Sequence, residues 1–106
     1  MLKLRINPVV INDLTDIFDY IADDNKEYAT KTIGMIYDKF ENLRMFPKIG
    51  SDLSKRVTFH TKYKYIIWKN FIIIYMVNND YLEIYRVINR YQDITKIFDS
   101  SPLHVL

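Results

Sequence analysis

The residues of this chain that could do chemistry gather toward its carboxyl end, and most of them are cations. Arg86, Arg90, Tyr91 and Asp93 follow one another through a predicted strand and just past it. An apolar strand needs no arginine to pack, whereas a cation can stabilise the negative charge that develops on a phosphate during RNA cleavage. This group therefore predicts that the rim of a sheet meets an anionic partner.

A second basic and aromatic group lies upstream, in the segment KYKYIIWK that begins at Lys62. Lys62 and Lys64 have the same parity, so on one strand they would share a face. Cations interleaved with aromatic rings can bind nucleic acid, because the cations meet phosphates and the rings stack on bases. The alternative for the rings is packing in the core or across strands, and we expect it for Tyr65, Trp68, Tyr75 and Tyr85.

The sequence lacks the motifs on which other common chemistries depend. The sequence has no P-loop, no dinucleotide-binding glycine motif and no zinc motif, and it contains only two glycines. His60 and His104 are far apart along the chain, no acidic cluster has metal-ligand spacing, and no serine lies in a nucleophile elbow. We therefore expect no cofactor and no metal, and the sequence supports neither metal-dependent hydrolysis nor a catalytic triad.

Length and composition indicate one globular domain. The chain has 106 residues, of which 49% are hydrophobic and 26% charged. It has no cysteine, which excludes disulfides and fits a reducing compartment. No apolar run approaches the roughly 20 residues of a membrane helix, and the first residues carry charge where a signal peptide would be apolar. We expect a cytoplasmic protein with no membrane partner. Its net charge of +2 arises in residues 56–106, where seven Lys and Arg face four Asp and Glu.

The amino-terminal half predicts a strand and a pair of helices. Residues 2–6 alternate apolar and basic side chains, as a half-buried strand does. Asn7 and Pro8 then suit the start of a helix, whose apolar positions recur at helical spacing as far as Ile21. Aspartates at 13, 16 and 19 fall on its predicted solvent face. A second helix follows residues 23–25 and ends at Pro47, so the two should form an antiparallel hairpin. Gly34, inside the second helix, predicts a close contact between helices.

The carboxyl-terminal half predicts a sheet. Residues 47–55 have loop composition, and the strand-favouring stretches that follow are 56–60, 63–69, 71–77 and 81–88. Asn78, Asn79 and Asp80 suit a turn, since Asn and Asp tolerate positive φ. The run Ile72–Ile74 is apolar on both faces and should be a covered central strand. Residues 93–98 could form a short closing helix, and 99–106 are a tail.

The predicted element order is β-α-α-β-β-β in a single domain over residues 1–98. This is an α+β fold in which the helical hairpin packs on one face of a small, mainly antiparallel sheet. The other face of the sheet should be partly open.

Four segments of the chain resemble the RelE/ParE superfamily of toxins from type II toxin–antitoxin modules, which includes plasmid stabilisation proteins. They are INPVVINDLTDIFDYIADDN, FENLRMFPKIGSDL, KYKYIIWKNFIIIYMVNND and YLEIYRVINRYQDITKIF. Together they span nearly the whole chain in the order and spacing of the family. The resemblance implies the RelE-like α+β fold, growth inhibition, a cognate antitoxin that binds in a toxin–antitoxin hetero-oligomer, and either DNA gyrase or the ribosome and its mRNA as the target.

The resemblance also distinguishes two mechanisms. RelE-like members cleave mRNA on the ribosome with basic residues, whereas ParE-like members inhibit DNA gyrase. Arg86 falls on an arginine that many members carry, and Asp93 falls on the aspartate of the family's Arg-Arg-Asp ending. Tyr91 and Gln92 stand where the two arginines of that ending would be, and Arg90 could substitute from beside them.

Two further departures weaken the ribonuclease alternative. Ile72 stands where ribonuclease members place an early arginine, and Asn89 stands where many have His or Tyr. The resemblance therefore favours a ParE-like action on gyrase, with a ribosome-dependent endoribonuclease and a non-toxic protein-interaction module as alternatives. If the chain is a ribonuclease, the candidate catalytic residues are Arg86, Arg90 and Lys64. The candidate target-binding residues are Lys62, Tyr91 and Asp93.

Overall fold

The computed structural model describes residues 1–92 and 94, and it has the predicted order of strands and helices. The elements are β1 (Lys3–Ile6), α1 (Pro8–Ala22), α2 (Lys26–Met45), the 3-10 turn η1 (Pro47–Ile49), β2 (Ser51–Asp52), the 3-10 turn η2 (Leu53–Lys55), β3 (Lys64–Trp68), β4 (Phe71–Asn78) and β5 (Tyr81–Asn89). One sheet has the strand order β1-β5-β4-β3-β2, with β1 parallel to β5 and the other pairs antiparallel. The predicted α+β fold is confirmed.

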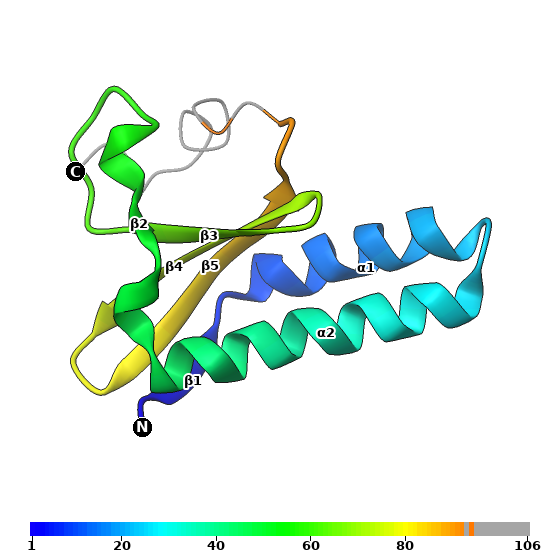
Figure 1. Ribbon diagram of the computed structural model, residues 1–106, viewed down its shortest axis with the longest axis horizontal. Coiled ribbons are helices and arrows are strands. Elements are labelled where there is room, and N and C mark those ends of the chain that lie inside the picture. The colour runs from blue at the N-terminus through cyan, green and yellow to red at the C-terminus, as the bar shows by residue number, and fades with distance from the viewer. Residues whose placement is uncertain (93, 95–106) are drawn as a thin grey trace.

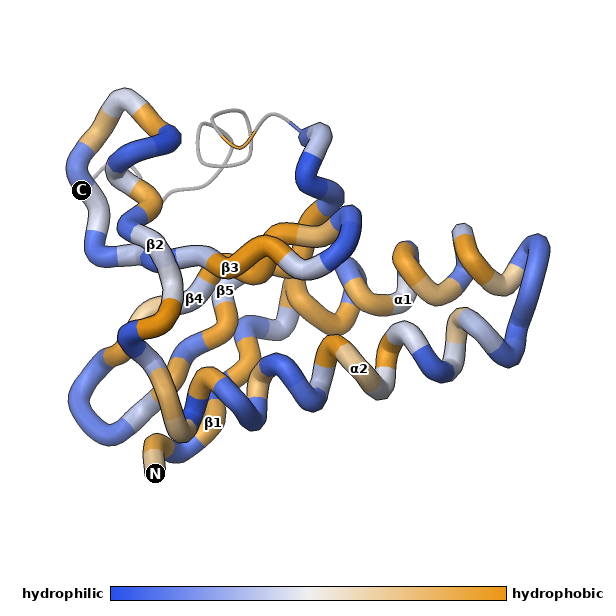
Figure 2. The backbone as a smooth tube through the Cα atoms, viewed as in Figure 1, coloured by the Kyte–Doolittle hydropathy of each residue, from blue (hydrophilic) through white to orange (hydrophobic). Residues whose placement is uncertain are grey.

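The two helices lie side by side along one face of the sheet (Figure 1). Each begins at an asparagine whose side chain accepts a backbone hydrogen bond: Asn7 from Val9 N–H at 3.5 Å, and Asn25 from Tyr28 N–H at 2.9 Å. The connection at residues 23–25 is hydrophilic, as Figure 2 shows at the far end of the hairpin. The predicted helical hairpin is therefore confirmed, with both starts set by local capping.

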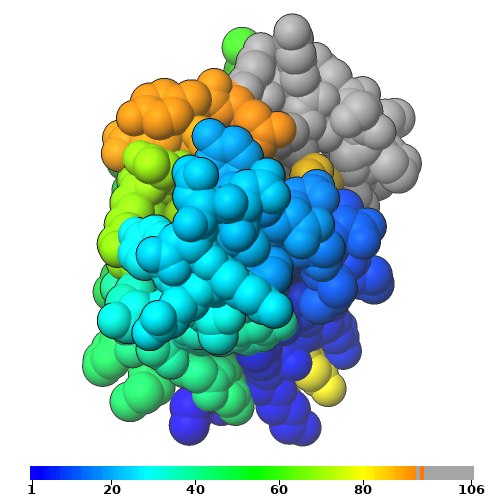
Figure 3. Space-filling view, turned by 90° about the vertical axis from the view of Figure 1, so that its right-hand side faces the viewer, coloured from blue at the N-terminus to red at the C-terminus, as the bar shows by residue number. Residues whose placement is uncertain are grey.

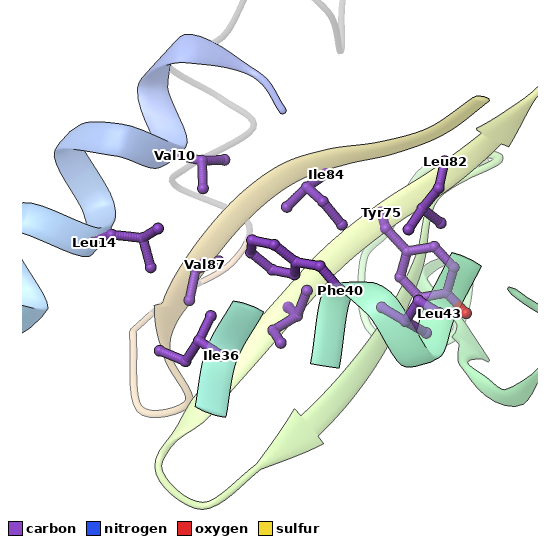
Figure 4. Close-up of a cluster of buried hydrophobic side chains, with 10 residues drawn as sticks. Val10, Leu14, Ile36, Phe40, Leu43, Tyr75, Leu82, Ile84 and Val87 are labelled. Atoms are coloured by element: carbon purple, nitrogen blue, oxygen red, sulfur yellow. The ribbon is translucent and has the colours of Figure 1, made fainter. Parts of the chain in front are cut away.

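The main core lies between the helices and the sheet (Figure 4). Its buried side chains come from both helices and from the two central strands: Val10, Leu14, Ile36, Phe40, Leu43, Ile73, Tyr75, Leu82, Ile84 and Val87. Ile72, Ile73 and Ile74 are all fully buried in β4, which has strands on both sides. The prediction that this run forms a covered central strand is confirmed.

The opposite face of the sheet carries a second buried cluster, so it is less open than predicted. This cluster consists of Leu53, Ile72, Ile74, Tyr85, Ile88 and Ile94. Val57 and Phe59 pack against it from a segment of bends rather than from a strand. The strand predicted at 56–60 is therefore wrong: its alternating apolar residues reflect burial against the sheet, without a ladder of backbone hydrogen bonds. Residues 47–55, predicted as loop, hold η1, the short β2 and η2.

A register shift in β5 decides where its arginine lies. Ile74 pairs with Arg86, but the next residue, Tyr75, pairs with Ile84, so Tyr85 is an extra residue on β5. Such a bulge bends the strand and changes which side chains face the core. After the bulge, the Val87 side chain packs in the helix-side core, whereas the Arg86 side chain reaches α1.

The two glycines have opposite surroundings. A Cβ at Gly34 would meet no atom within 4 Å, so the predicted close helix contact is wrong. A Cβ at Gly50 would overlap the hydroxyl of Tyr75. That hydroxyl accepts a hydrogen bond from Gly50 N–H at 3.0 Å and donates one to the carbonyl of Pro47 at 2.7 Å. Tyr75 thereby ties the segment that leads into β2 to the core.

Candidate target-binding site

Arg86 is held by an aspartate from the second turn of α1. Its Nε donates to Oδ2 of Asp13 at 2.9 Å and its Nη2 donates to Oδ1 at 2.8 Å. The backbone N–H of Val87 also donates to Oδ2 of Asp13, at 3.0 Å. The Asp13 side chain is only 9% exposed, so it is not on the solvent face where its helical position predicted it. The hydrogen bonds that Arg86 donates to Asp13 raise the pKa of Arg86, although partial burial opposes them.

This arrangement follows from the shortness of β1. The pairing of β1 with β5 ends at Ile6 and Ile84, so the later residues of β5 have no strand on that side. Asn7 and Asp13 then supply hydrogen bonds in place of a strand, to the carbonyl of Tyr85 at 3.4 Å and to Val87 N–H. Arg86 is therefore part of how the sheet edge is completed.

A second cationic group surrounds the end of β5. Arg90 donates from its backbone N–H to the carbonyl of Asn70 at 2.7 Å, and from Nη1 to the carbonyl of Lys69 at 3.4 Å. Lys69 is the first residue of the turn between β3 and β4, with φ of 53°, and its Nζ lies 5.2 Å from the ring centre of Trp68. Arg90 and Lys69 are both exposed, and Tyr91 is 79% exposed. The end of the sheet thus presents two cations and an aromatic ring to solvent.

A pocket of about 430 Å³ separates this end of the sheet from the helical hairpin. Figure 3 looks onto the tip of the hairpin, with residues 90–92 (orange) above it and the β3–β4 turn (yellow-green) beside it. The pocket walls include Asp16, Tyr20 and Tyr28 from the helices, and Lys69 and Arg86 from the sheet. The pocket therefore joins the exposed Lys69 to the paired Arg86 in one concave surface, and the neighbouring Arg90 lies outside its lining.

Lys64 and Lys62 lie elsewhere. Lys64 begins β3 and pairs with Tyr75, and Tyr75 pairs with Ile84. The opposite end of β3, at Trp68, is the end that lies in line with Asn89 and Arg90. Lys62 precedes the strand, so the predicted sharing of a face through strand alternation does not apply to it.

Lys64 has an acidic neighbour on β2. It is paired in register with Asp52, whose pKa is lowered chiefly by the hydrogen bond from Ser54 N–H and to a lesser degree by the charge of Lys64. The structure therefore places Arg86 in the pocket lining and Arg90 beside Lys69 at the pocket's border, and it leaves Lys62 and Lys64 away from both. Asp93 and the helix predicted for residues 93–98 lie outside the described residues, apart from Ile94, which is helical.

The aromatic residues divide as predicted. Tyr75 and Tyr85 are buried, and Tyr65 and Trp68 are partly buried against the two core clusters. Packing is therefore confirmed for all four. Asp13 was not predicted as a partner of Arg86, and no local signal could have identified it, because the two residues are far apart along the chain.

The part of the chain that the structure describes holds no group of three or more His, Cys, Asp or Glu side chains placed to bind a metal ion. None of its helices combines the length and apolar character needed to cross a membrane.

Comparisons with known proteins place this geometry in a family. The chain matches the family described as "ParE toxin of type II toxin-antitoxin system, parDE" over residues 4–94. It is similar to a solved structure titled "Chromosomal ParDE TA system from P. aeruginosa", with a TM-score of 0.70 at 20% sequence identity, over 84% of this chain and 96% of that one. At that identity the likeness shows the fold alone. No curated protein matches. Because the family match spans most of its length, the chain belongs to the ParE toxin family of type II toxin–antitoxin systems.

Proposed function

We propose that this ParE-family toxin inhibits growth by acting on DNA gyrase, with the exposed end of β5 as part of its contact surface. Residues of that surface are Lys69, Arg90 and Tyr91. ParE-like members of the superfamily inhibit gyrase, as stated above for the resemblance, and the family match agrees with that branch. A gyrase target would place the toxin's action in the cytoplasm.

The observation that carries the proposal is the pairing of Arg86 with Asp13. Among the residues that a ribonuclease mechanism would use, Arg86 has the best match to the superfamily. Here two of its nitrogens already donate to one carboxylate, at 2.9 and 2.8 Å. To stabilise a phosphate, the guanidinium would first have to leave Asp13, which would leave a largely buried carboxylate unpaired. This cost favours contact with a protein target over phosphate chemistry at Arg86.

Arg90 is better suited to binding than to catalysis. Arg90 is exposed, and so is the next residue, Tyr91. Within the described part of the chain, the only side-chain hydrogen bond of Arg90 goes to the carbonyl of Lys69. No described acid or histidine contacts its guanidinium, so it has no partner for general acid–base chemistry. Arginine and tyrosine are the residue types that most often dominate protein–protein contacts.

Two assays run side by side test the proposal. The purified toxin should inhibit supercoiling of relaxed plasmid by DNA gyrase, and it should leave mRNA intact on programmed ribosomes. Arg90→Glu should raise the concentration needed for half-inhibition about tenfold or more. Lys31→Glu makes the same change in charge on the exposed face of α2 and should change it less than about twofold.

Three outcomes would contradict the proposal. Ribosome-dependent cleavage that disappears in Arg86→Ala or Arg90→Ala would establish the ribonuclease alternative. Inhibition of gyrase that is equally strong in Arg90→Glu would remove the proposed surface. A folded protein that causes no growth arrest on induction would favour a non-toxic interaction module.

A further inference from the structure

The loop between η2 and β3 carries a group of exposed cations. Residues 53–79 hold five Lys and Arg and one His but no Asp or Glu. Most of these basic residues lie in residues 54–62, which form the basic loop, and their side chains are exposed there: Lys55, Arg56, His60 and Lys62. In Figure 1 the basic loop lies at the end of β3 opposite to the β3–β4 turn, so it is separate from the proposed gyrase surface.

Alternating burial along the basic loop turns its cations outward. Val57 and Phe59 pack against the buried cluster on this face of the sheet. Arg56, His60 and Lys62 alternate with the buried positions and are exposed. Figure 2 shows the corresponding change between hydrophobic and hydrophilic residues along the loop. The apolar side chains that imitated a strand in the sequence therefore hold the loop against the sheet and leave its basic side chains in solvent.

Side-chain hydrogen bonds fix both ends of the basic loop. The Ser54 hydroxyl donates to the carbonyl of Thr61 at 3.1 Å and accepts from Thr61 N–H at 3.0 Å. Asp52 accepts from Ser54 N–H at 2.9 Å, and Leu53 between them is fully buried. A loop held in this way presents its cations with little further ordering, which lowers the entropy that a ligand must offset on binding.

The cations of the basic loop lack acidic partners among the described residues. Other arginines of the described chain form ion pairs with carboxylates: Arg5 with Glu83, Arg44 with Glu41, and Arg86 with Asp13. Arg56 instead lies over the ring of Tyr65 at 5.0 Å, and its Nε donates to the Tyr65 hydroxyl at 3.1 Å. This contact orients the guanidinium and uses only its Nε–H. Cations gathered without counter-ions repel one another, and an anionic ligand would relieve that repulsion.

The composition of the basic loop selects a phosphate backbone as the ligand. Protein–protein interfaces are enriched in aromatic residues and depleted of lysine, whereas no large hydrophobic residue of this loop is exposed. Single-stranded nucleic acid binds through rings that stack on its bases, but Phe59 and Tyr63 pack against the sheet. Lysine and arginine without exposed rings match the phosphates of a duplex, whose bases stay stacked.

From these observations we infer that the basic loop binds the phosphate backbone of double-stranded DNA, without preference for sequence. The choice of DNA over RNA rests on the proposed function, because gyrase acts on duplex DNA. Each cation that meets a phosphate releases counter-ions condensed on the DNA, and this release supplies the binding free energy. The basic loop would hold the toxin on the DNA that gyrase carries, while the exposed end of β5 contacts the enzyme.

The test measures fluorescence anisotropy of a short labelled DNA duplex with the full-length toxin at several salt concentrations. The logarithm of the association constant should fall against the logarithm of salt concentration with a slope of about −3. Lys55→Gln combined with Lys62→Gln should weaken binding about tenfold or more at ~0.1 M salt and reduce the slope by about two. Lys26→Gln combined with Lys31→Gln makes the same change in net charge on exposed positions of α2. This control should bind within about twofold of the wild type, with an unchanged slope.

The wild-type slope needs no variant, and a slope shallower than about −1 would overturn the inference. Equal binding by the loop variant and the α2 control would also overturn it, as would tighter binding to duplex RNA than to duplex DNA. Because these titrations contain no gyrase, their result is separate from the supercoiling assay. DNA binding without inhibition of gyrase would refute only the proposed target, and inhibition of gyrase without DNA binding would refute only the role of the basic loop.

Discussion

The backbone groups at two edges of the same sheet are satisfied in different ways. Beyond β1, the edge of β5 is closed by side chains: Asn7, Asp13 and Gln92 bond to backbone groups of Tyr85, Val87 and Asn89. Beyond β2, the edge of β3 has no comparable partners within the described residues. The closed edge lies beside α1, which begins directly after β1 and can therefore present polar side chains to it. The difference between the two edges therefore follows from the polar side chains that Asn7 and α1 bring to β5.

Removal of Asp13 should have the largest effect, because it reopens the closed edge. Asp13→Ala leaves Arg86 partly buried without its counter-ion and Val87 N–H without an acceptor. We expect a loss of about 3 kcal/mol in the free energy of unfolding, measured by urea denaturation. Asp16→Ala, on the same helix and without a hydrogen bond or ion pair among described residues, should change it by less than about 0.5 kcal/mol. Equal stabilities of the two variants would mean that Asp13 does not complete the edge.

A change at Gly50 should disturb the part of the β3 edge that β2 covers, at Lys64 and Tyr65. Gly50→Ala places a methyl group against the Tyr75 hydroxyl, which its hydrogen bond to Pro47 keeps in place. The expected loss in unfolding free energy is about 2 kcal/mol. Gly34→Ala is the matched control: it has free space around it and should stabilise the protein by about 0.5 to 1 kcal/mol. A harmless Gly50→Ala would show that β2 does not depend on the Tyr75 contact.

The stability of this part of the sheet edge should also depend on alkaline pH, through ionisation of Tyr63. Burial, followed by the nearby Tyr85, raises the pKa of Tyr63 from 10.0 to about 12. The folded state therefore favours the neutral phenol, so its contribution to stability is complete below pH 10 and is lost as the pH rises toward 12. Because Tyr63 is only half buried, we expect about 1 kcal/mol. Tyr63→Phe should remove this part of the pH dependence in denaturation measured at several pH values. An unchanged slope would argue against burial of the phenol.

The smallest effect is expected at the open edge itself. Ile67→Thr keeps a β-branched side chain on a partly exposed position and should change the unfolding free energy by less than about 0.5 kcal/mol. Val87→Thr, which makes a related change at the closed edge, buries a hydroxyl and should lose about 1 to 2 kcal/mol. If the two substitutions cost the same, the two edges are not as different as they look.

Local signals predicted most of the fold, because the features concerned are set by neighbours in sequence. Asn7 and Asn25 cap helices within three residues, and the turn after Asn78 uses Asn79 at φ of 55°. The strand at residues 56–60 was wrongly predicted because side chains buried against the sheet gave the alternating pattern of a strand. The close helix contact at Gly34 was wrongly predicted because it depended on atoms distant in sequence.

The candidate site was harder to predict than the fold. Arg86 and Arg90 were identified from their types and positions, but the role of Arg86 depends on a one-residue bulge and on a carboxylate from the first helix. Neither leaves a trace in the sequence around the arginine. Lys69 was predicted as the last residue of a strand, and its place beside Trp68 and Arg90 follows only from the way three strands end together.

The parallel pairing of β1 with β5 has a consequence for how the toxin is made. Lys3 leaves the ribosome near the start of synthesis, yet its partner in the sheet is Tyr81. The helical hairpin can form early from local contacts, but the first strand has no partner until almost the whole chain has emerged. Until then the apolar side of β1 and the inner faces of both helices remain uncovered. A chain cut short before Tyr81 would therefore lack β5, which joins β1 to the rest of the sheet, and toxicity should require nearly complete synthesis.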